Sequence, residues 1–165
     1  MSEAAEKPEL NRVYEVPKMK GPELRVVRLK GGQMIACQVI SDTFFGVEIH
    51  YDSRVRRSEP CVKPESACPG CQGKKPKKIL YYLHVFSNHH GQCFVELTHA
   101  TMLRVTEILE GEPSFRGKCL ELRRTAADNG RMLVKMCETM VPRTNLPKPA
   151  DPENTLRYLW EWGRK

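Results

Sequence analysis

The chain has 165 residues, the length of one ordinary domain, of which 40% are hydrophobic and 28% are charged. This is a globular composition, and it excludes disordered, collagen-like and coiled-coil chains. The longest nearly unbroken apolar run, residues 79–86, is far shorter than the roughly 20 residues that cross a bilayer, so we expect no association with membranes. The first residues lack the apolar stretch of a secretory signal, which predicts a cytoplasmic location.

The N-terminal part of the chain is predicted to be an arm followed by strands. Residues 1–20 are expected to form a flexible arm, since their charged start offers no apolar pattern. Residues 24–30 and 33–40 are two apolar stretches separated by a Gly-Gly pair, which is typical of two strands joined by a bend. Residues 43–49 continue in the same style.

The seven cysteines are of two kinds. An odd number without a secretory signal favours thiols or metal ligands over disulfides. Cys37, Cys119 and Cys137 stand singly among apolar residues, so we expect them in the core. The other group lies in EPCVKPESACPGCQGKK, a polar segment with almost nothing else to bury. Such a segment needs another source of stability, and a bound metal ion is the simplest one.

The cysteine spacing predicts a structural zinc site. Cys68-Pro-Gly-Cys71 is a C-x2-C turn that lets two thiolates reach one tetrahedral ion, and Cys61 offers a third. His50 is the preferred fourth ligand, because it ends one apolar strand and begins the cysteine-bearing insertion; Cys93 is its main rival. The alternative is that the C-x2-C pair is a redox motif or a set of incidental loop thiols.

The same insertion carries most of the chain's net positive charge. The whole chain has a formal charge of +7, and the stretch from Asp52 to Lys78 holds eight basic residues against three acidic ones. A clustered positive field attracts polyanions, which favours nucleic acid over a basic loop that only aids solubility. The residues expected to contact phosphates are Arg54, Arg56, Arg57, Lys74, Lys75, Lys77 and Lys78.

Residues 79–87 and 92–98 flank His-His-Gly and are predicted to form a hairpin with a bulge. In the register that we expect, Phe86 lies opposite Phe94 and Tyr82 opposite Thr98, and the aliphatic residues between them face the core. Tyr82, Phe86 and Phe94 would then be exposed, where they could stack on the bases of a single strand. A helix or the C-terminal tail covering these rings is the alternative.

The C-terminal half is predicted to contain a helix, two strands and a second helix. Residues 98–109 have a helical apolar spacing, a Thr cap and a following glycine, and residues 115–124 and 131–139 alternate as strands do. Residues 141–152 are a Pro-rich linker, and residues 153–165 form a helix that docks on the barrel or on a protein partner.

The order strand, strand, strand, helix, strand, strand predicts a mainly β fold. It is the order of an OB-fold, a five-stranded Greek-key barrel whose surface binds oligonucleotides. We therefore expect this barrel over residues 21–140, with the zinc loop inserted at residues 50–78.

The run LKGGQMIACQVI, followed by His50, Cys61 and Cys68-Pro-Gly-Cys71, resembles the zinc-containing single-stranded-DNA-binding proteins of T-even phages and their relatives. The resemblance covers roughly residues 24 to 140 and is specific only in the His and three Cys. It implies an OB-fold with a structural zinc bound by those four residues. Proteins of that type usually end in an acidic tail, whereas this chain ends in DPENTLRYLWEWGRK, so the tail's role is not carried over.

These observations predict a binding protein rather than an enzyme. The chain has no P-loop and no GxSxG motif, and the H-x-E of zinc deaminases is missing. The expected function is binding of single-stranded DNA with little sequence preference, in replication, recombination or repair. The alternatives are an RNA-binding module, a zinc-stabilised adaptor that binds proteins, and a nuclease or deaminase accessory with an open metal site.

Overall fold

The computed structural model describes residues 24–61, 64–126 and 130–149. It is mainly β, as predicted, with 41% strand and 17% helix. Two α-helices and two 3-10 helices accompany the strands: η1 (Glu65–Ala67), α1 (Pro69–Gln72), α2 (His99–Ile108) and η2 (Arg143–Asn145). The strands are β1 (Arg25–Val27), β2 (Met34–Val39), β3 (Phe45–Asp52), β4 (Arg57–Pro60), β5 (Lys77–Ser87), β6 (Gly91–Leu97), β7 (Cys119–Arg124) and β8 (Met132–Met136).

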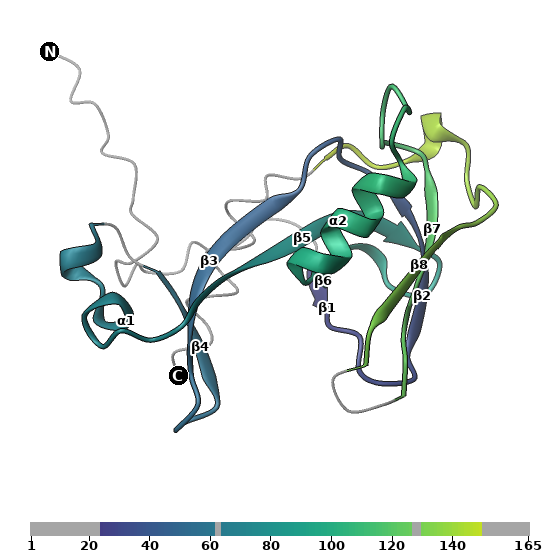
Figure 1. The fold of residues 1–165 in the computed structure, drawn as a ribbon. Helices are drawn as coiled ribbons and strands as arrows, with labels where there is room; N and C mark the ends of the chain where they lie inside the picture. The colour runs from purple at the N-terminus through teal and green to yellow at the C-terminus, as the bar shows by residue number, and fades with distance from the viewer. Residues whose placement is uncertain (1–23, 62–63, 127–129, 150–165) are drawn as a thin grey trace, which may run out of the picture.

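The strands form one strongly curved sheet in the order β1-β6-β5-β2-β7-β8 (Figure 1). Every pairing is antiparallel except that of β1 with β6. The set β7-β2-β5-β6 is a Greek key, because the fourth of these strands in the chain returns to lie beside the first. The long β5 pairs with β3 along its first half and with β2 near its end. β3 and β4 therefore extend away from the main sheet as a separate hairpin.

The expected OB-fold-like barrel of five strands is not confirmed for the described residues. They form eight strands, and no pairing among them joins the edge strands β1 and β8. The predicted glycine bend between the first two strands is present at Gly32, where φ is +82°, and β3 begins after a further break that follows β2. β4 was not predicted, because its sequence Arg-Ser-Glu-Pro has no apolar alternation; its pairing with β3 defines it.

The main core lies between the sheet and α2. Leu83 and Val85 of β5 and Val95 and Leu97 of β6 are fully buried there, as the alternation predicted. The helix also agrees with its prediction, because the Thr98 hydroxyl accepts a hydrogen bond from the backbone N–H of Thr101.

The register of the β5–β6 hairpin differs from the predicted one by two residues. Phe86 pairs with Gln92 and His84 with Phe94, because the turn consists of residues 88–90. The turn has three residues, as predicted, but lies one position earlier in the chain, and within it the Ser87 hydroxyl accepts a hydrogen bond from the His90 N–H (2.9 Å). An even shift keeps every side chain on its expected face.

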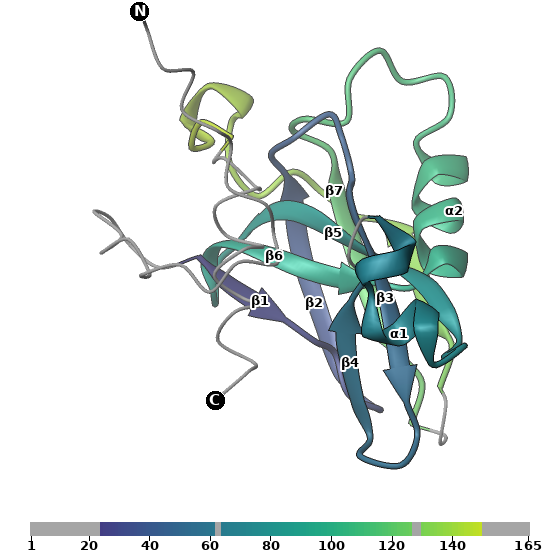
Figure 2. The ribbon, with the colours of Figure 1, turned by 90° about the vertical axis from the view of Figure 1, so that its left-hand side faces the viewer.

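The second face of this hairpin carries a smaller apolar cluster, and here the predicted exposure was wrong. Tyr82 and Phe94 are fully buried, together with Ile49, and Phe86 is partly buried. The cause is that β1 and β3 flank the hairpin (Figure 2). These two strands bring apolar residues to this face. The Tyr82 hydroxyl donates to Glu96 (3.3 Å), as a buried tyrosine usually requires.

Part of the predicted linker is held against the sheet. The Gln38 side chain makes two hydrogen bonds with the backbone of Val141, and Arg116 donates to the carbonyls of Leu146 and Pro147. The predicted arm at residues 1–20 and the predicted C-terminal helix at residues 153–165 lie outside the described residues. None of the helices in the described ranges has the length and apolar character needed to span a bilayer.

Candidate metal centre

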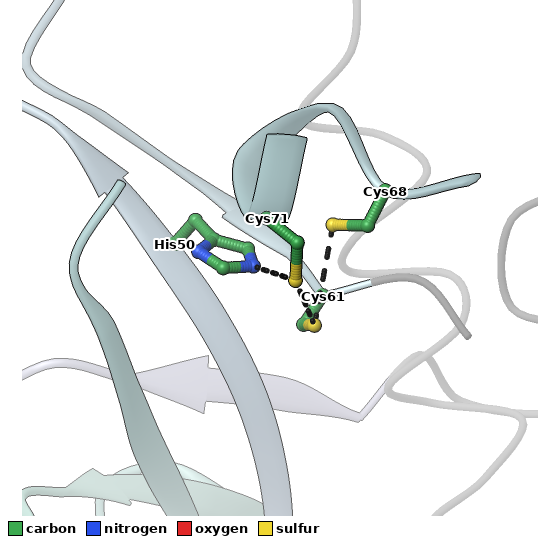
Figure 3. Close-up of side chains that lie close together, drawn as sticks. All are labelled: His50, Cys61, Cys68 and Cys71. Atoms are coloured by element: carbon green, nitrogen blue, oxygen red, sulfur yellow. Dashed lines mark hydrogen bonds between the residues drawn. The ribbon is translucent and has the colours of Figure 1, made fainter. Parts of the chain in front are cut away.

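One histidine and three cysteines meet at the base of the inserted segment (Figure 3). They are His50, Cys61, Cys68 and Cys71, and their ligand atoms all lie within 4.8 Å of one another. The sequence predicted these four residues, and the structure brings them together as a group that could hold a metal ion.

Secondary structure delivers each ligand to this point. His50 lies near the end of β3, and Cys61 follows β4, which pairs with that strand. The N–H of Cys61 donates to the Glu48 carbonyl (2.8 Å), which extends this ladder by one bond. Cys68 caps the short helix α1, and Cys71 lies inside it. The C-x2-C turn is therefore the start of a helix, with Pro69 at its first position, where its missing N–H matters least.

The distances match those between ligands of one tetrahedral ion. The Sγ atoms of Cys61 and Cys71 are 3.6 Å apart, and those of Cys61 and Cys68 are 4.0 Å apart. Cys71 Sγ is 3.3 Å from Nε2 of His50. Tetrahedral bonds of the usual length for zinc separate two sulfurs by about 3.8 Å and a sulfur from a nitrogen by about 3.6 Å. The seven cysteines form no disulfide with one another, so no disulfide competes for these sulfurs.

The orientation of His50 suits a ligand. Its side chain is buried, and Nδ1 lies 3.1 Å from the Lys75 carbonyl, to which a protonated Nδ1 donates. This leaves Nε2 unprotonated and directed at the cysteines. Metal-binding histidines commonly donate their second ring N–H in this way, which fixes both tautomer and ring plane.

Gly70 is the residue that lets α1 approach the histidine. A Cβ atom built on Gly70 would lie only 2.4 Å from the His50 ring, well inside van der Waals contact. The sequence pattern marks this position as the x of a C-x2-C turn. The structure gives the physical reason for a glycine there, because any side chain would displace the imidazole.

The Cys71 thiol is difficult to ionise without a cation. Burial, followed by the neighbouring thiols of Cys61 and Cys68, raises the pKa of Cys71 to about 11. Three thiolates this close repel one another, so they share the site as anions only when a positive ion compensates them. The donor set therefore favours a bound cation over three free thiols.

The rival ligand Cys93 lies elsewhere. It is fully buried in the main core, paired across the sheet with Val85, and burial raises its pKa to about 11. The expected core positions are confirmed for Cys37 and Cys119, which are buried, while Cys137 is partly exposed.

The predicted basic residues lie on the segment that carries the cysteines and on the strands that flank it, and they fall into two groups. Lys75 pairs with Asp52 (2.7 Å), and Lys77 pairs with Glu65 (3.3 Å), so these two cations stabilise the segment itself. The other five are exposed and form no ion pair among the described residues. We call these five the basic surface: Arg54, Arg56, Arg57, Lys74 and Lys78.

Sequence reasoning missed an exposed ring on this surface. Tyr51 is 38% exposed near the end of β3, and Nζ of Lys78 lies 5.8 Å from the centre of its ring. Val55 at the tip of the β3–β4 hairpin is also exposed. The sequence did contain a signal for this ring. The alternation of apolar residues continues from Ile49 to Tyr51, which indicates that the strand runs past His50 and includes Tyr51.

Comparison of the chain with protein-family models, with curated proteins and with solved structures finds no match.

Proposed function

We propose that this protein binds single-stranded nucleic acid on a basic surface whose shape is fixed by a structural zinc ion. The single observation that carries the proposal is that the five exposed cations lie on the stretch of chain, residues 54–78, that also carries three of the four clustered ligands. The Lys75–Asp52 ion pair links the loop that follows α1 to the β3–β4 hairpin, so the metal-bound loop and the arginine-bearing hairpin are tied together.

Zinc is the metal that this donor set favours. Three thiolates and one imidazole are a usual structural set for zinc, and soft sulfur ligands disfavour magnesium and calcium. Four protein ligands leave no position for a water molecule or substrate. We therefore assign the ion a structural role and propose no catalytic activity.

The basic surface supplies the attraction for phosphates. Its five cations are exposed, and three of them stand at the tip of one hairpin, with Arg54 and Arg56 in the turn and Arg57 at the start of β4. Unpaired, clustered cations release the counterions of a nucleic acid when they bind it, which is the main source of sequence-independent affinity.

Tyr51 supplies the preference for a single strand. Tyr82 and Phe94 cannot serve as stacking rings, since they are buried in the protein. Tyr51 is exposed and stands beside Lys78, which is the combination of ring and cation that holds an unpaired base and its phosphate. Single-stranded DNA is the proposed ligand, and RNA is the alternative that the experiment below distinguishes.

We also propose that the fold is a variant of the OB-fold. The order β6-β5-β2-β7-β8, with α2 between β6 and β7, supports this assignment, because an OB-fold is a Greek-key barrel that can be partly open. β1, β3 and β4 would then be additions to the five common strands.

The test is a titration of labelled oligo-dT, oligo-U and duplex DNA over a range of salt concentrations. We expect the tightest binding to a single strand. Replacing Arg54 and Arg56 by Gln should lower the slope of log K against log salt by roughly 0.7 for each phosphate that the variant no longer neutralises. Arg123→Gln is the matched control, because Arg123 is exposed on β7, outside the basic surface.

Stacking has a separate signature. Tyr51→Ala should weaken single-strand binding by about 1–3 kcal/mol without changing the salt slope, while Tyr51→Phe should keep the affinity. Failure of folded, zinc-loaded protein to bind any oligonucleotide would contradict the proposal and favour the protein-binding adaptor.

A further inference from the structure

A pocket lined by three arginines lies between the first turns of α2 and the adjoining ends of β7 and β8. Its volume is about 400 Å³, within the range of ligand pockets. Arg104 of α2, Arg124 of β7 and Arg131 before β8 line it, and among the described residues no acidic side chain does. In the described part of the chain, none of these three arginines forms an ion pair. Three uncompensated guanidinium groups around one hollow form a receptor for an anion.

Arg124 gives a second, independent indication of a ligand. One of its terminal nitrogens donates to the Gly130 carbonyl (3.2 Å), which holds the guanidinium at the pocket wall. Its Nε is buried and has no hydrogen-bond partner. A buried donor without a partner is rare and unfavourable, and an anion beside the guanidinium would compensate its charge.

A second pocket adjoins the first. It measures about 430 Å³ and shares two of its lining residues, Thr98 and Ala100, with the arginine pocket. Its other walls are mostly apolar: Ile79 and Leu80 of β5, and the ring of His99, which is held by the Tyr81 hydroxyl (3.2 Å). The two hollows thus meet at the start of α2, one lined by arginines and the other mostly apolar, and together we call them the bipartite site.

We propose that this bipartite site binds one nucleotide, with its phosphate in the arginine pocket and its base in the apolar pocket. Guanidinium groups are the preferred partners of phosphate oxygens, because their paired N–H donors match the geometry of the anion. A base is flat and apolar on its faces, and the imidazole of His99 offers a ring against which it can stack.

Lys78 connects this site to the basic surface, since it belongs to the surface and also lines the apolar pocket. A strand lying on the basic surface would thus lead into the site. That the bound nucleotide is part of a nucleic-acid strand rests on the proposed function. The other possibility is a free nucleotide, and the experiment below distinguishes the two.

The first arm titrates the zinc-loaded protein with a mononucleotide, dTMP, and follows the arginine Nε–Hε resonances by NMR. We expect the Arg124 resonance to shift as the site fills. The double variant R104Q/R131Q should weaken dTMP binding at least roughly tenfold, because it removes two charge-assisted hydrogen-bonding groups from around one phosphate. Arg104 and Arg131 are exposed, so this variant should fold. R123Q is the matched control and should leave dTMP binding unchanged.

The second arm repeats the oligo-dT titration with the same variants. Loss of affinity in R104Q/R131Q, but not in R123Q, supports the site with the strand as its source. If dTMP binds and oligo-dT does not, the nucleic-acid proposal fails, and the nucleotide site stands with a free ligand. If oligo-dT binds equally to parent and double variant and dTMP does not shift Arg124, this inference is overturned, and the proposed function stands. Absence of both bindings overturns both.

Discussion

The sheet and the segment that follows β3 are held together by different forces. Among the described residues, the main core contains fourteen buried residues, twelve of them from the strands and α2. In the described part of residues 53–76, by contrast, only Pro60, Cys68 and Gly70 are buried. The sheet is stabilised by apolar burial, which is spread over many side chains. The inserted segment depends on four ligand atoms at one point, so its order should be lost in one step.

This difference explains why the two regions place different demands on sequence. A sheet tolerates exchanges among apolar residues of similar size, because many side chains share the packing. A metal site needs particular atoms at particular positions. The basic surface belongs to the second region. We therefore expect binding of nucleic acid to depend on the metal ion, although the nucleic acid itself does not contact the ion.

The largest expected effect is that of removing a metal ligand. Cys71→Ser should abolish tight zinc binding, which in structural sites amounts to about 10–16 kcal/mol of apparent free energy. Elemental analysis measures the metal. Amide exchange should rise in α1, where Gln72 and Gly73 donate to the carbonyls of Cys68 and Pro69, while β2 and β7 stay protected.

Cys137→Ser is the matched control, since Cys137 is a partly exposed thiol outside the cluster. It should retain the full metal content. Loss of protection throughout the sheet of the Cys71 variant would break the comparison, because it would show that the two regions unfold as one unit.

The next largest effect should fall on the sheet alone. Phe94→Ala should lower the free energy of unfolding by about 3–5 kcal/mol, as expected for truncating a buried aromatic side chain. Metal content should not change. Phe86→Ala should have a smaller effect, because Phe86 is only partly buried. Melting curves with metal analysis measure both, and equal losses from the two variants would contradict the burial difference.

The parts of the fold that follow from local patterns were predictable. Alternation in the β5–β6 hairpin identified its core face, and the cap at Thr98 identified α2. The exposure of Tyr82 and Phe94 was not predictable, because β1 and β3 bring the residues that bury this face from distant parts of the chain. β4 was missed because its only signal is its pairing with β3.

The candidate site shows the same division. The C-x2-C turn, Cys61 and His50 were identified from residue types and spacing. The carbonyl that orients His50 belongs to Lys75. From the sequence, only the side chain of Lys75 was given a role, as a contact for phosphates. The arginine pocket joins Arg104 to Arg131 through tertiary contacts, and no motif in the sequence links them.

A smaller effect, confined to the metal centre, should come from Gly70. Gly70→Ala places a Cβ against the His50 ring, so the ring must turn away from the cysteines. We expect metal affinity to fall about 10–100-fold, the usual range for disturbing a ligand's support. Competition with a chelator measures it. Gly73→Ala is the graded control: its Cβ would lie 3.2 Å from the Pro69 carbonyl and meet no ligand, so most affinity should remain.

The smallest effect should be a pH dependence that belongs to the sheet. His84 is fully buried, stacks on Phe94 with 4.7 Å between ring centres, and accepts a hydrogen bond from Gln92 (2.9 Å). Burial, and then the charge of Arg116, lower its pKa to about 4. The folded protein therefore holds this imidazole neutral at a pH at which an unfolded chain would protonate it.

The sign of the effect follows from proton binding. Between the ordinary histidine pKa of about 6.5 and the folded value of about 4, the unfolded state binds a proton that the folded state does not, so stability falls as the pH is lowered. Denaturant unfolding at several pH values measures this slope, and His84→Phe should reduce it. Acid also releases zinc, because protons compete for the thiolates, so metal content is followed in the same samples. Zinc release should be the same in both proteins, since His84 is not one of the four clustered ligands. If the free energy of unfolding depends on pH in His84→Phe as it does in the parent protein, the acid sensitivity comes from the metal centre. The pH dependence would then not belong to the sheet.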